Sequence, residues 1–157
     1  MILAAIDPGL SGAICFLDAG TGEIDVHDMP VLKVASGREV DAHALSAIFY
    51  QKHAGHAFVE MAWNRPHDGG NNSFKSGVGY GIIRGVLAAI GVPYTTVSPQ
   101  KWKRDLRVSD GKDGSRQRAK ELFPSYAELF ARVKDDGRAE SCLICEWGRR
   151  SLTGNSK

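Results

Sequence analysis

The sequence has few cysteines, no long apolar run and no large excess of charge of either sign. Three cysteines occur among 157 residues, at positions 15, 142 and 145, so a disulfide-stapled scaffold is not expected. No apolar run approaches the length of a membrane span, and the N-terminus lacks the basic region and cleavage site of a signal peptide. These absences predict an intracellular, cytoplasmic protein. The net charge of +2 indicates no particular partner.

Cys142 and Cys145 form a CxxC pair, but the sequence contains no second pair of ligands and no chelating set of histidines and cysteines. The two residues between them, Leu143 and Ile144, are apolar. The spacing therefore favours the core face of a helix over a zinc or redox site.

The composition is that of an ordinary globular domain, with 43% hydrophobic and 24% charged residues. A chain of this length can bury one sizeable core. No internal repeat or low-complexity segment is found. We therefore expect one domain over residues 1–150, followed by a frayed tail over residues 151–157.

Hydrophobic periodicity and turn residues predict an α/β fold, a mixed five-stranded sheet flanked by helices. The first three strands, ending near residues 6, 18 and 29, form an antiparallel meander, and residues 30–39 are a connector. The remaining elements are predicted in this order: a helix over 41–53, a strand over 57–61, a helix over 73–90, a strand over 93–97, and helices over 98–102, 115–123, 126–133 and 138–150.

The first strand ends in Asp7, and the turn after it contains Pro8, Gly9 and Gly12. A buried strand that delivers a carboxylate to a glycine-permitted turn lets a metal ion or a phosphate approach closely. The alternative is that Asp7 only caps a surface turn, as Asp before Pro often does.

Glu60 is the only charged residue in a short apolar strand. Burying an unpaired charge costs too much, so Glu60 must lie at the strand's end, in an ion pair or on a metal ion. Here the functional interpretation is favoured.

A third group of acids, Asp135, Asp136 and Glu140, opens the last predicted helix. Residues four apart on a helix are separated by about 40° and share a face, whereas residues five apart diverge by about 140°. This geometry favours Asp136 as the partner of Glu140. Asp135 stays a candidate if Gly137 delays the start of the helix. The alternative for this group is helix capping and a favourable interaction with the helix dipole.

Carboxylates are the ligands of hard cations, and two such ions held together can activate water and stabilise a leaving oxygen in phosphodiester hydrolysis. Residues 1–60 hold eight acids against three Lys and Arg residues, whereas residues 61–157 hold seventeen Lys and Arg residues against ten acids. The basic excess is greatest over residues 99–120, which favours a polyanionic partner. A solvated helix face is the alternative.

The helix predicted over residues 73–90 contains four glycines, Gly77, Gly79, Gly81 and Gly85. Each disfavours a helix by about 1 kcal/mol relative to Ala. They indicate close packing against another backbone, in the same chain or in a partner subunit.

Together these segments resemble the RuvC family of Holliday junction resolvases, in particular its short phage and prophage forms, within the ribonuclease H-like superfamily. The resemblance rests on IDPGLSGA from Ile6, FVEMA from Phe58, FKSGVGYGIIRGVLAAIGVP from Phe74, VSPQKWK from Val97 and DDGRAESCLICEWGRR from Asp135. It implies a RuvC-like nuclease domain over residues 1–150 that acts as a homodimer, depends on two Mg²⁺ ions (with Mn²⁺ as a substitute) and makes paired nicks in four-way DNA junctions. It also implies the cytoplasm of a bacterial cell or of a phage-infected bacterium.

Carried over by motif, Asp7 and Glu60 match the first two catalytic acids of the family, and Glu140 matches one acid of the C-terminal pair. The bacterial pattern has two Asp residues three apart, whereas Gly137 lies three residues before Glu140. Asp136 or Asp135 must then supply the fourth carboxylate, and a His that serves the site in some relatives has no evident counterpart. We expect Asp7 to bridge two ions, Glu60 and one of these Asp residues to bind one ion each, and Glu140 to complete the site or orient the attacking water.

Basic and aromatic side chains are the expected DNA contacts. For Phe74 the alternative to a DNA contact is a position in the hydrophobic core. For Lys112 the alternative is a solvated position in a loop. The expected set is Trp63, Asn64, Arg65, Phe74, Lys101, Lys103, Arg104, Lys112 and Arg116.

Three other functions fit part of the pattern. One is a ribonuclease H-like nuclease that acts on RNA or hybrids, and another is a junction-binding protein that does not cleave. The third, an actin-like nucleotide-binding module, needs a second phosphate turn and a second domain, for which 157 residues are too few.

Overall fold

The computed structural model describes residues 1–61 and 70–154, and its centre is a five-stranded sheet in the order β3-β2-β1-β6-β7. Strands β1 (Ile2–Ile6), β2 (Ala13–Asp18) and β3 (Ile24–Asp28) pair antiparallel, and β6 (His56–Glu60) and β7 (Tyr94–Val97) run parallel to β1. This sheet confirms the predicted mixed five-stranded arrangement.

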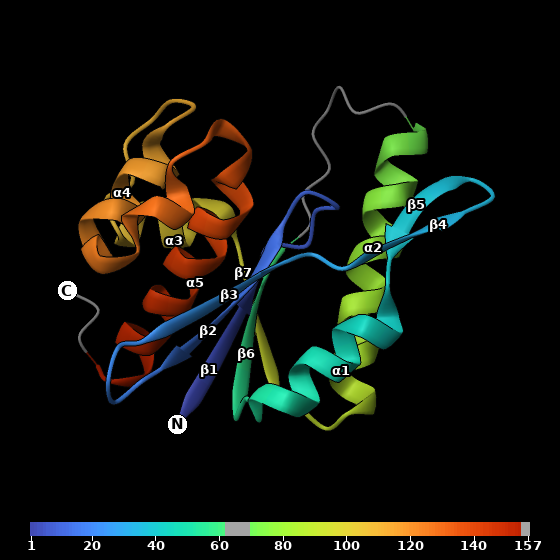
Figure 1. The fold of residues 1–157 in the computed structure, drawn as a ribbon, viewed down its shortest axis with the longest axis horizontal. Coiled ribbons are helices and arrows are strands. Elements are labelled where there is room, and N and C mark those ends of the chain that lie inside the picture. Colours follow the sequence, from blue (N-terminus) through green and yellow to red (C-terminus); the bar gives the residue numbers. More distant parts are fainter. Residues whose placement is uncertain (62–69, 155–157) are drawn as a thin grey trace.

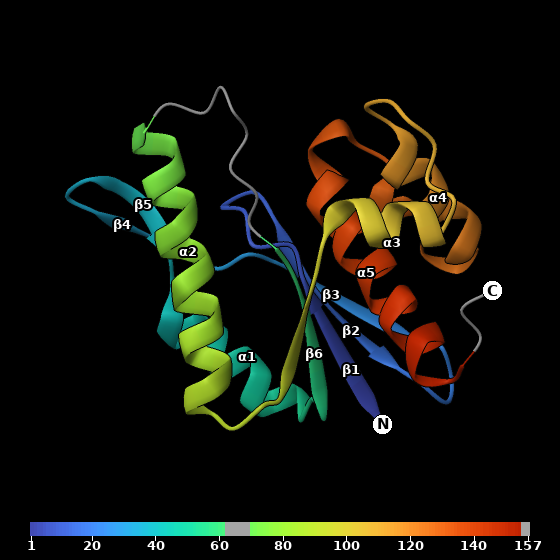
Figure 2. The ribbon, with the colours of Figure 1, turned by 180° about the vertical axis from the view of Figure 1, so that it is seen from behind.

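Helices cover both faces of the sheet (Figures 1 and 2). Helices α1 (Ala42–Lys52) and α2 (Gly70–Ala89) lie on one side. On the other side lie α3 (Pro99–Asp105), α4 (Gly114–Leu122) and α5 (Asp136–Leu152), with the 3-10 helices η1 (Pro124–Phe130) and η2 (Val133–Asp135).

Alternation along β1 divides the core into two clusters. Leu3 and Ala5 belong to the cluster that packs against α3, α4 and α5, whereas Ala4 and Ile6 belong to the cluster that packs against α1 and α2. Successive side chains of a strand point to opposite faces of the sheet. All four side chains are fully buried, so β1 contributes to the hydrophobic core on both faces of the sheet.

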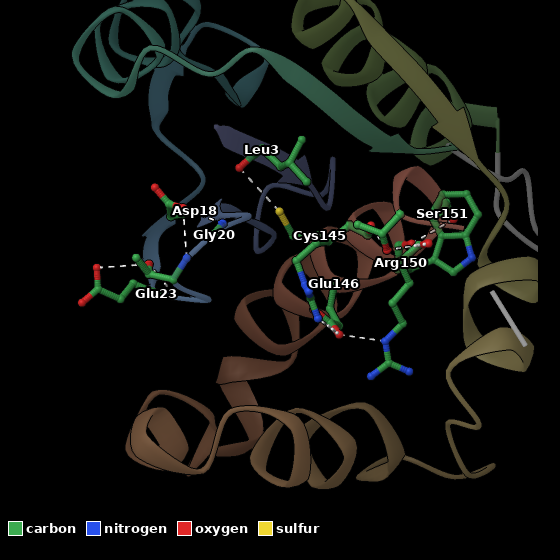
Figure 3. Close-up of polar contacts among 12 residues, drawn as sticks. Leu3, Asp18, Gly20, Glu23, Cys145, Glu146, Arg150 and Ser151 are labelled. Carbon is green, nitrogen blue, oxygen red and sulfur yellow. Dashed lines mark hydrogen bonds and ion pairs between the residues drawn. The ribbon is translucent and has the colours of Figure 1, made fainter. Parts of the chain in front are cut away.

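Local signals set several element boundaries as expected. The Asp41 side chain accepts the backbone N–H of Ala44 at the start of α1, and Ser98 caps α3 by accepting the N–H of Lys101. The turn between β2 and β3 is held by Asp18, whose carboxylate accepts the N–H groups of Gly20 and Thr21 (Figure 3). Such short-range hydrogen bonds are readable from sequence because they join residues two or three apart.

Three predicted elements differ in the structure. The connector over residues 30–39 contains a hairpin of β4 (Val31–Val34) and β5 (Gly37–Val40), which reverses at Gly37 with a φ of 130°. The helix predicted over 126–133 is 3-10 geometry instead. Helix α5 begins at Asp136 rather than near Arg138, so Gly137 does not delay it, and it ends at Leu152, two residues beyond the predicted end. The last three residues of the predicted tail, 155–157, lie outside the described residues.

The three cysteines are fully buried in the cluster beside α5, and all three are free. The Cys145 thiol donates to the backbone carbonyl of Leu3 (Figure 3), and burial raises the pKa of Cys15 well above its usual value. The core interpretation of the CxxC pair is confirmed. Within the described part of the chain, no helix has the length and apolar character required to span a membrane.

Candidate active site

Three carboxylates from distant parts of the chain meet at one end of the sheet. Asp7 directly follows β1, Glu60 is the last residue of β6, and Glu140 lies one turn into α5. One carboxylate oxygen from each lies within 4.8 Å of the other two. The parallel pairing of β1 and β6 produces the first contact, because Ile6 is opposite Val59 in the register and the next residues are Asp7 and Glu60.

The turn after Asp7 requires glycine. The Asp7 N–H donates to the Ala13 carbonyl at 3.0 Å, and the Gly12 N–H donates to the Gly9 carbonyl at 2.8 Å. A Cβ at Gly12 would lie 2.2 Å from the Asp7 carbonyl oxygen, which is a severe overlap. The Asp7 side chain caps this turn only weakly, since the Gly9 N–H is 3.5 Å from its Oδ1. The capping alternative therefore does not account for Asp7.

Helix α5 starts directly against this turn, and Gly137 makes that contact possible. A Cβ at Gly137 would lie 2.6 Å from the Ser11 carbonyl oxygen and 2.7 Å from the Gly12 Cα. Any side chain at this position would push α5 away from the turn that carries Asp7. The Asp that the bacterial pattern has three residues before the last acid thus has no room here, which explains the departure in the motif.

Helices α3 and α4 supply donors to two of the three acids. The Trp102 Nε1–H donates to Glu60 Oε1 at 2.7 Å. The Lys103 ammonium and the Ser115 hydroxyl donate to Glu140 Oε1 at 2.8 and 2.9 Å. Lys103 was expected to contact DNA, and the structure places it at the acids.

Trp102 and Ser115 were missed by the sequence analysis. Nothing local marks them, because each meets an acid far away in the chain, 42 residues from Trp102 and 25 residues from Ser115. The available signal was one large apolar residue in the basic QKWKR segment, which indicates that this helix turns one side toward the core.

The electrostatics of the site favour a bound cation. The pKa of Asp7 is raised to about 7, chiefly by burial and then by the charges of Glu60 and Glu140. The pKa of Glu60 is also raised to about 7, chiefly by burial; the hydrogen bond from Trp102 opposes this rise and the charge of Glu140 adds to it. Burial and mutual repulsion thus disfavour the ionised form of these carboxylates. Such groups are suited to hard divalent cations, whose charge offsets the repulsion.

The structure does not bring Asp135 or Asp136 into this group, as far as the described residues show. Asp136 shares a helix face with Glu140, as predicted, but its Oδ1 accepts from the Arg116 Nε at 2.8 Å. Asp135 is 1% exposed and accepts both the backbone N–H and the guanidinium of Arg132. These Arg132 hydrogen bonds lower the pKa of Asp135. Asp135 therefore completes the capping box at the start of η2, and its side chain makes no hydrogen bond that caps α5, so the capping alternative is not confirmed for Asp135.

The other expected DNA contacts fall into four groups. Lys101 and Arg104 are exposed and ion-paired with Asp105, and Lys112 is exposed in the turn before α4. Arg116 is only 8% exposed and is bonded to Asp113 and Asp136. Phe74 is 74% exposed, so the core alternative for it is wrong. Three further residues lie outside the described part of the chain, Trp63, Asn64 and Arg65.

The chain was also compared with known proteins. No protein-family model matches the chain. A curated relative, the chloroplastic Holliday junction resolvase MOC1 of Chlamydomonas reinhardtii, is 29% identical over 156 aligned positions, which cover 83% of this chain and 18% of that protein. The chain thus spans less than a fifth of the length of this relative.

Solved structures match over nearly the whole chain. RuvC of Thermus thermophilus superposes with a TM-score of 0.68 at 16% identity, covering 99% of this chain and 98% of that one. The same protein in complex with a Holliday junction substrate gives 0.68 at 14% identity, with 99% and 97% covered. The yeast mitochondrial Holliday junction resolvase Ydc2 gives 0.56 at 13% identity, with 96% and 80% covered. The chain therefore has the RuvC form of the ribonuclease H-like fold, as its motifs implied.

Proposed function

We propose that this protein is a structure-selective DNA endonuclease that resolves four-way junctions by metal-assisted phosphodiester hydrolysis. The observation that carries the proposal is the convergence of Asp7, Glu60 and Glu140 at one end of a RuvC-like sheet. A relative named as a Holliday junction resolvase and a structural neighbour solved with a junction support the substrate class.

Asp7, Glu60 and Glu140 each place a carboxylate oxygen within 4.8 Å of the other two. These three acids would hold Mg²⁺, and Glu140 could instead orient the attacking water. When bound, such ions activate water and stabilise the leaving oxygen. All three donors are hard oxygen ligands, which suits Mg²⁺ and Mn²⁺.

Asp136 is the proposed fourth carboxylate, because it lies one turn before Glu140 on the same face of α5. To serve in that role, the Asp136 carboxylate must lose its hydrogen bond from Arg116 and bind the ion instead. The released Arg116 would then be available to a DNA phosphate, the ligand that a guanidinium pairs with most strongly. We assign Asp135 only to the capping box of η2.

The DNA is proposed to lie over the acid end of the sheet, between α3 and the start of α2. Lys101, Lys103, Arg104 and Lys112 supply positive charge on one side, and exposed Phe74 provides a stacking surface on the other. Because base stacking is sequence-tolerant, this combination suits recognition of DNA shape.

A homodimer is proposed from the glycines of α2. A Cβ at Gly77, Gly81 or Gly85 would meet no atom of the described residues within 4 Å, whereas one at Gly79 would touch Val40. Three of the four glycines therefore have no packing role within the described chain, which leaves the partner-subunit alternative. Their spacing of four places them on one face, so two copies of α2 can approach closely. Two copies would also supply the two active sites that paired nicks require.

The direct test compares substrates with the full chain and Mg²⁺. A four-way DNA junction, a linear duplex and an RNA–DNA hybrid of equal length are incubated in parallel, and the products are resolved on denaturing gels. We expect symmetric nicks in the junction alone. Preferential cutting of the hybrid would replace this proposal with a ribonuclease H-like activity.

The matched control is Asp7→Asn. We expect its cleavage rate to fall by roughly 10²- to 10³-fold, while junction affinity in Ca²⁺ stays unchanged because the basic surface is intact. Cleavage that survives this substitution would refute the assigned site. Junction binding without cleavage by the unsubstituted chain would make it a binding protein.

A further inference from the structure

Trp102 is fully buried, yet it carries a polar group that reaches the acids. It lies on α3 in the core cluster beside α5, with no exposed surface. Its indole Nε1–H donates to Glu60 Oε1 at 2.7 Å. A buried donor without a partner is unfavourable, so the indole and the carboxylate hold each other in place.

The chemistry of this contact differs from that of the other donors at the site. The Lys103 ammonium also contacts an acid, but a cation competes with a metal ion for the same charge. An indole is neutral, does not ionise and is a poor metal ligand. It can therefore keep its hydrogen bond while the remaining lone pairs of the carboxylate bind an ion.

We propose that Trp102 is a positioning residue that fixes the orientation of the Glu60 carboxylate for metal binding in the junction-cleaving reaction. This inference rests on the proposed function. Hydrogen bonds of this kind orient metal ligands and typically change metal affinity by about 10- to 100-fold when removed. Trp102 and Lys103 are adjacent on α3 and bond to different acids, so this helix sets the positions of Glu60 and Glu140 together.

The chain provides a matched control in Trp147. It lies in the same core cluster, is 8% exposed, and its Nε1–H donates to Asp105 Oδ2 at 3.0 Å. Its partner is therefore a carboxylate outside the group of three acids. Replacing either Trp by Phe removes one indole donor and shrinks one buried ring, so the two variants differ chiefly in which acid loses its partner.

The first experiment measures Mn²⁺ affinity by calorimetry, without DNA, for the wild type, Trp102→Phe and Trp147→Phe. We expect Trp102→Phe to bind Mn²⁺ about 10- to 100-fold more weakly and its cleavage rate to recover as Mn²⁺ is raised. Trp147→Phe should bind like the wild type. Equal affinities in all three proteins would overturn the positioning role. A wild type that neither binds Mn²⁺ nor cleaves junctions would instead overturn the proposed function.

A second measurement does not depend on the folding of Trp102→Phe. The three indole N–H resonances are recorded by ¹⁵N-labelled NMR in the wild type and in Glu60→Gln at about pH 8.5, above the Glu60 pKa of about 7, so that the wild-type carboxylate is charged. The resonances are assigned by replacing the other two tryptophans in turn. A hydrogen bond to a charged acceptor is stronger than one to a neutral amide. The Trp102 proton should therefore move upfield in Glu60→Gln and the Trp147 proton should not. An unchanged Trp102 resonance would also overturn the inference.

Discussion

The helical layers on the two faces of the sheet both bury a core but differ in what they present around it. On the α3–α5 face, Trp102, Phe130 and Leu143 are fully buried, and this layer supplies donors to the acids. On the opposite face, the outer side of α2 exposes glycines with open space around them. One layer thus supports the three acids of the proposed metal site. The other layer carries the surface that we propose for a second copy.

The largest expected effect comes from the acids of α5. Glu140→Gln should reduce junction cleavage by roughly 10²- to 10³-fold, because it removes a charge from the group of three. Asp136→Asn should have a smaller effect, and Asp135→Asn should lower thermal stability while sparing most activity. Cleavage rates and melting temperatures of the three variants give this order. A loss for Asp135→Asn as large as that for Glu140→Gln would show that the structural assignment of these acids is wrong.

The contact between α5 and the Asp7 turn is tested by Gly137→Asp, which installs the acid of the bacterial pattern. The new side chain would overlap the Ser11 carbonyl, so we expect destabilisation by about 1–3 kcal/mol or more and loss of cleavage. Denaturant unfolding and nicking assays measure both effects. Gly55→Ala is the comparison, since its Cβ would make only ordinary contacts, the nearest at 3.5 Å from the Met1 side chain. Higher activity in Gly137→Asp would contradict the packing explanation for the missing acid.

The pH dependence of stability tests how much the ionised acids of the site destabilise the fold. The folded-state pKa values of Asp7 and Glu60 are about 7, above the unfolded values of about 3.9 and 4.3. The protonated acids thus stabilise the fold below about pH 4, and this stability is lost as the pH rises through 7.

In EDTA, the melting temperature of Asp7→Asn should therefore exceed that of the wild type by a margin that grows from pH 5 to pH 8. A change of 1 kcal/mol corresponds to about 2–4 °C for a chain of this size. Adding Mg²⁺ should raise the melting temperature of the wild type and leave that of Asp7→Asn unchanged. A margin that is constant with pH would show that Asp7 does not titrate in this range.

The smallest effect on the fold is expected on the open face. Gly81→Leu should keep or raise the melting temperature, since Gly disfavours a helix by about 1 kcal/mol and the position is exposed. The same change should weaken the proposed dimer, which analytical ultracentrifugation measures, and should convert paired nicks into single ones. Gly79→Leu is the control for the packed side, because it would strike Val40 and lower stability. An unaltered dimer in Gly81→Leu would place the subunit contact elsewhere.

Sequence patterns predicted most of the elements, and the candidate residues they named include all three acids that meet, Asp7, Glu60 and Glu140. Asp7 and Glu60 lie at the ends of neighbouring apolar strands. The Asp41 and Ser98 side chains cap their helices by accepting the backbone N–H of the residue three positions later. These features depend on local spacing, which the order of residues determines directly. The hairpin over residues 31–40 was missed because its alternation is short and only its turn identifies it.

Tertiary structure alone decided that Glu140 meets Asp7 while Asp135 and Asp136 take other partners. Helix geometry places Asp136 and Glu140 on one face of α5. Only the packing of α4 beside α5 shows that Asp136 accepts a hydrogen bond from Arg116. The same holds for the Trp102 hydrogen bond to Glu60, which joins residues 42 positions apart. A local pattern determines which way a side chain can point, whereas its partner depends on how distant elements pack.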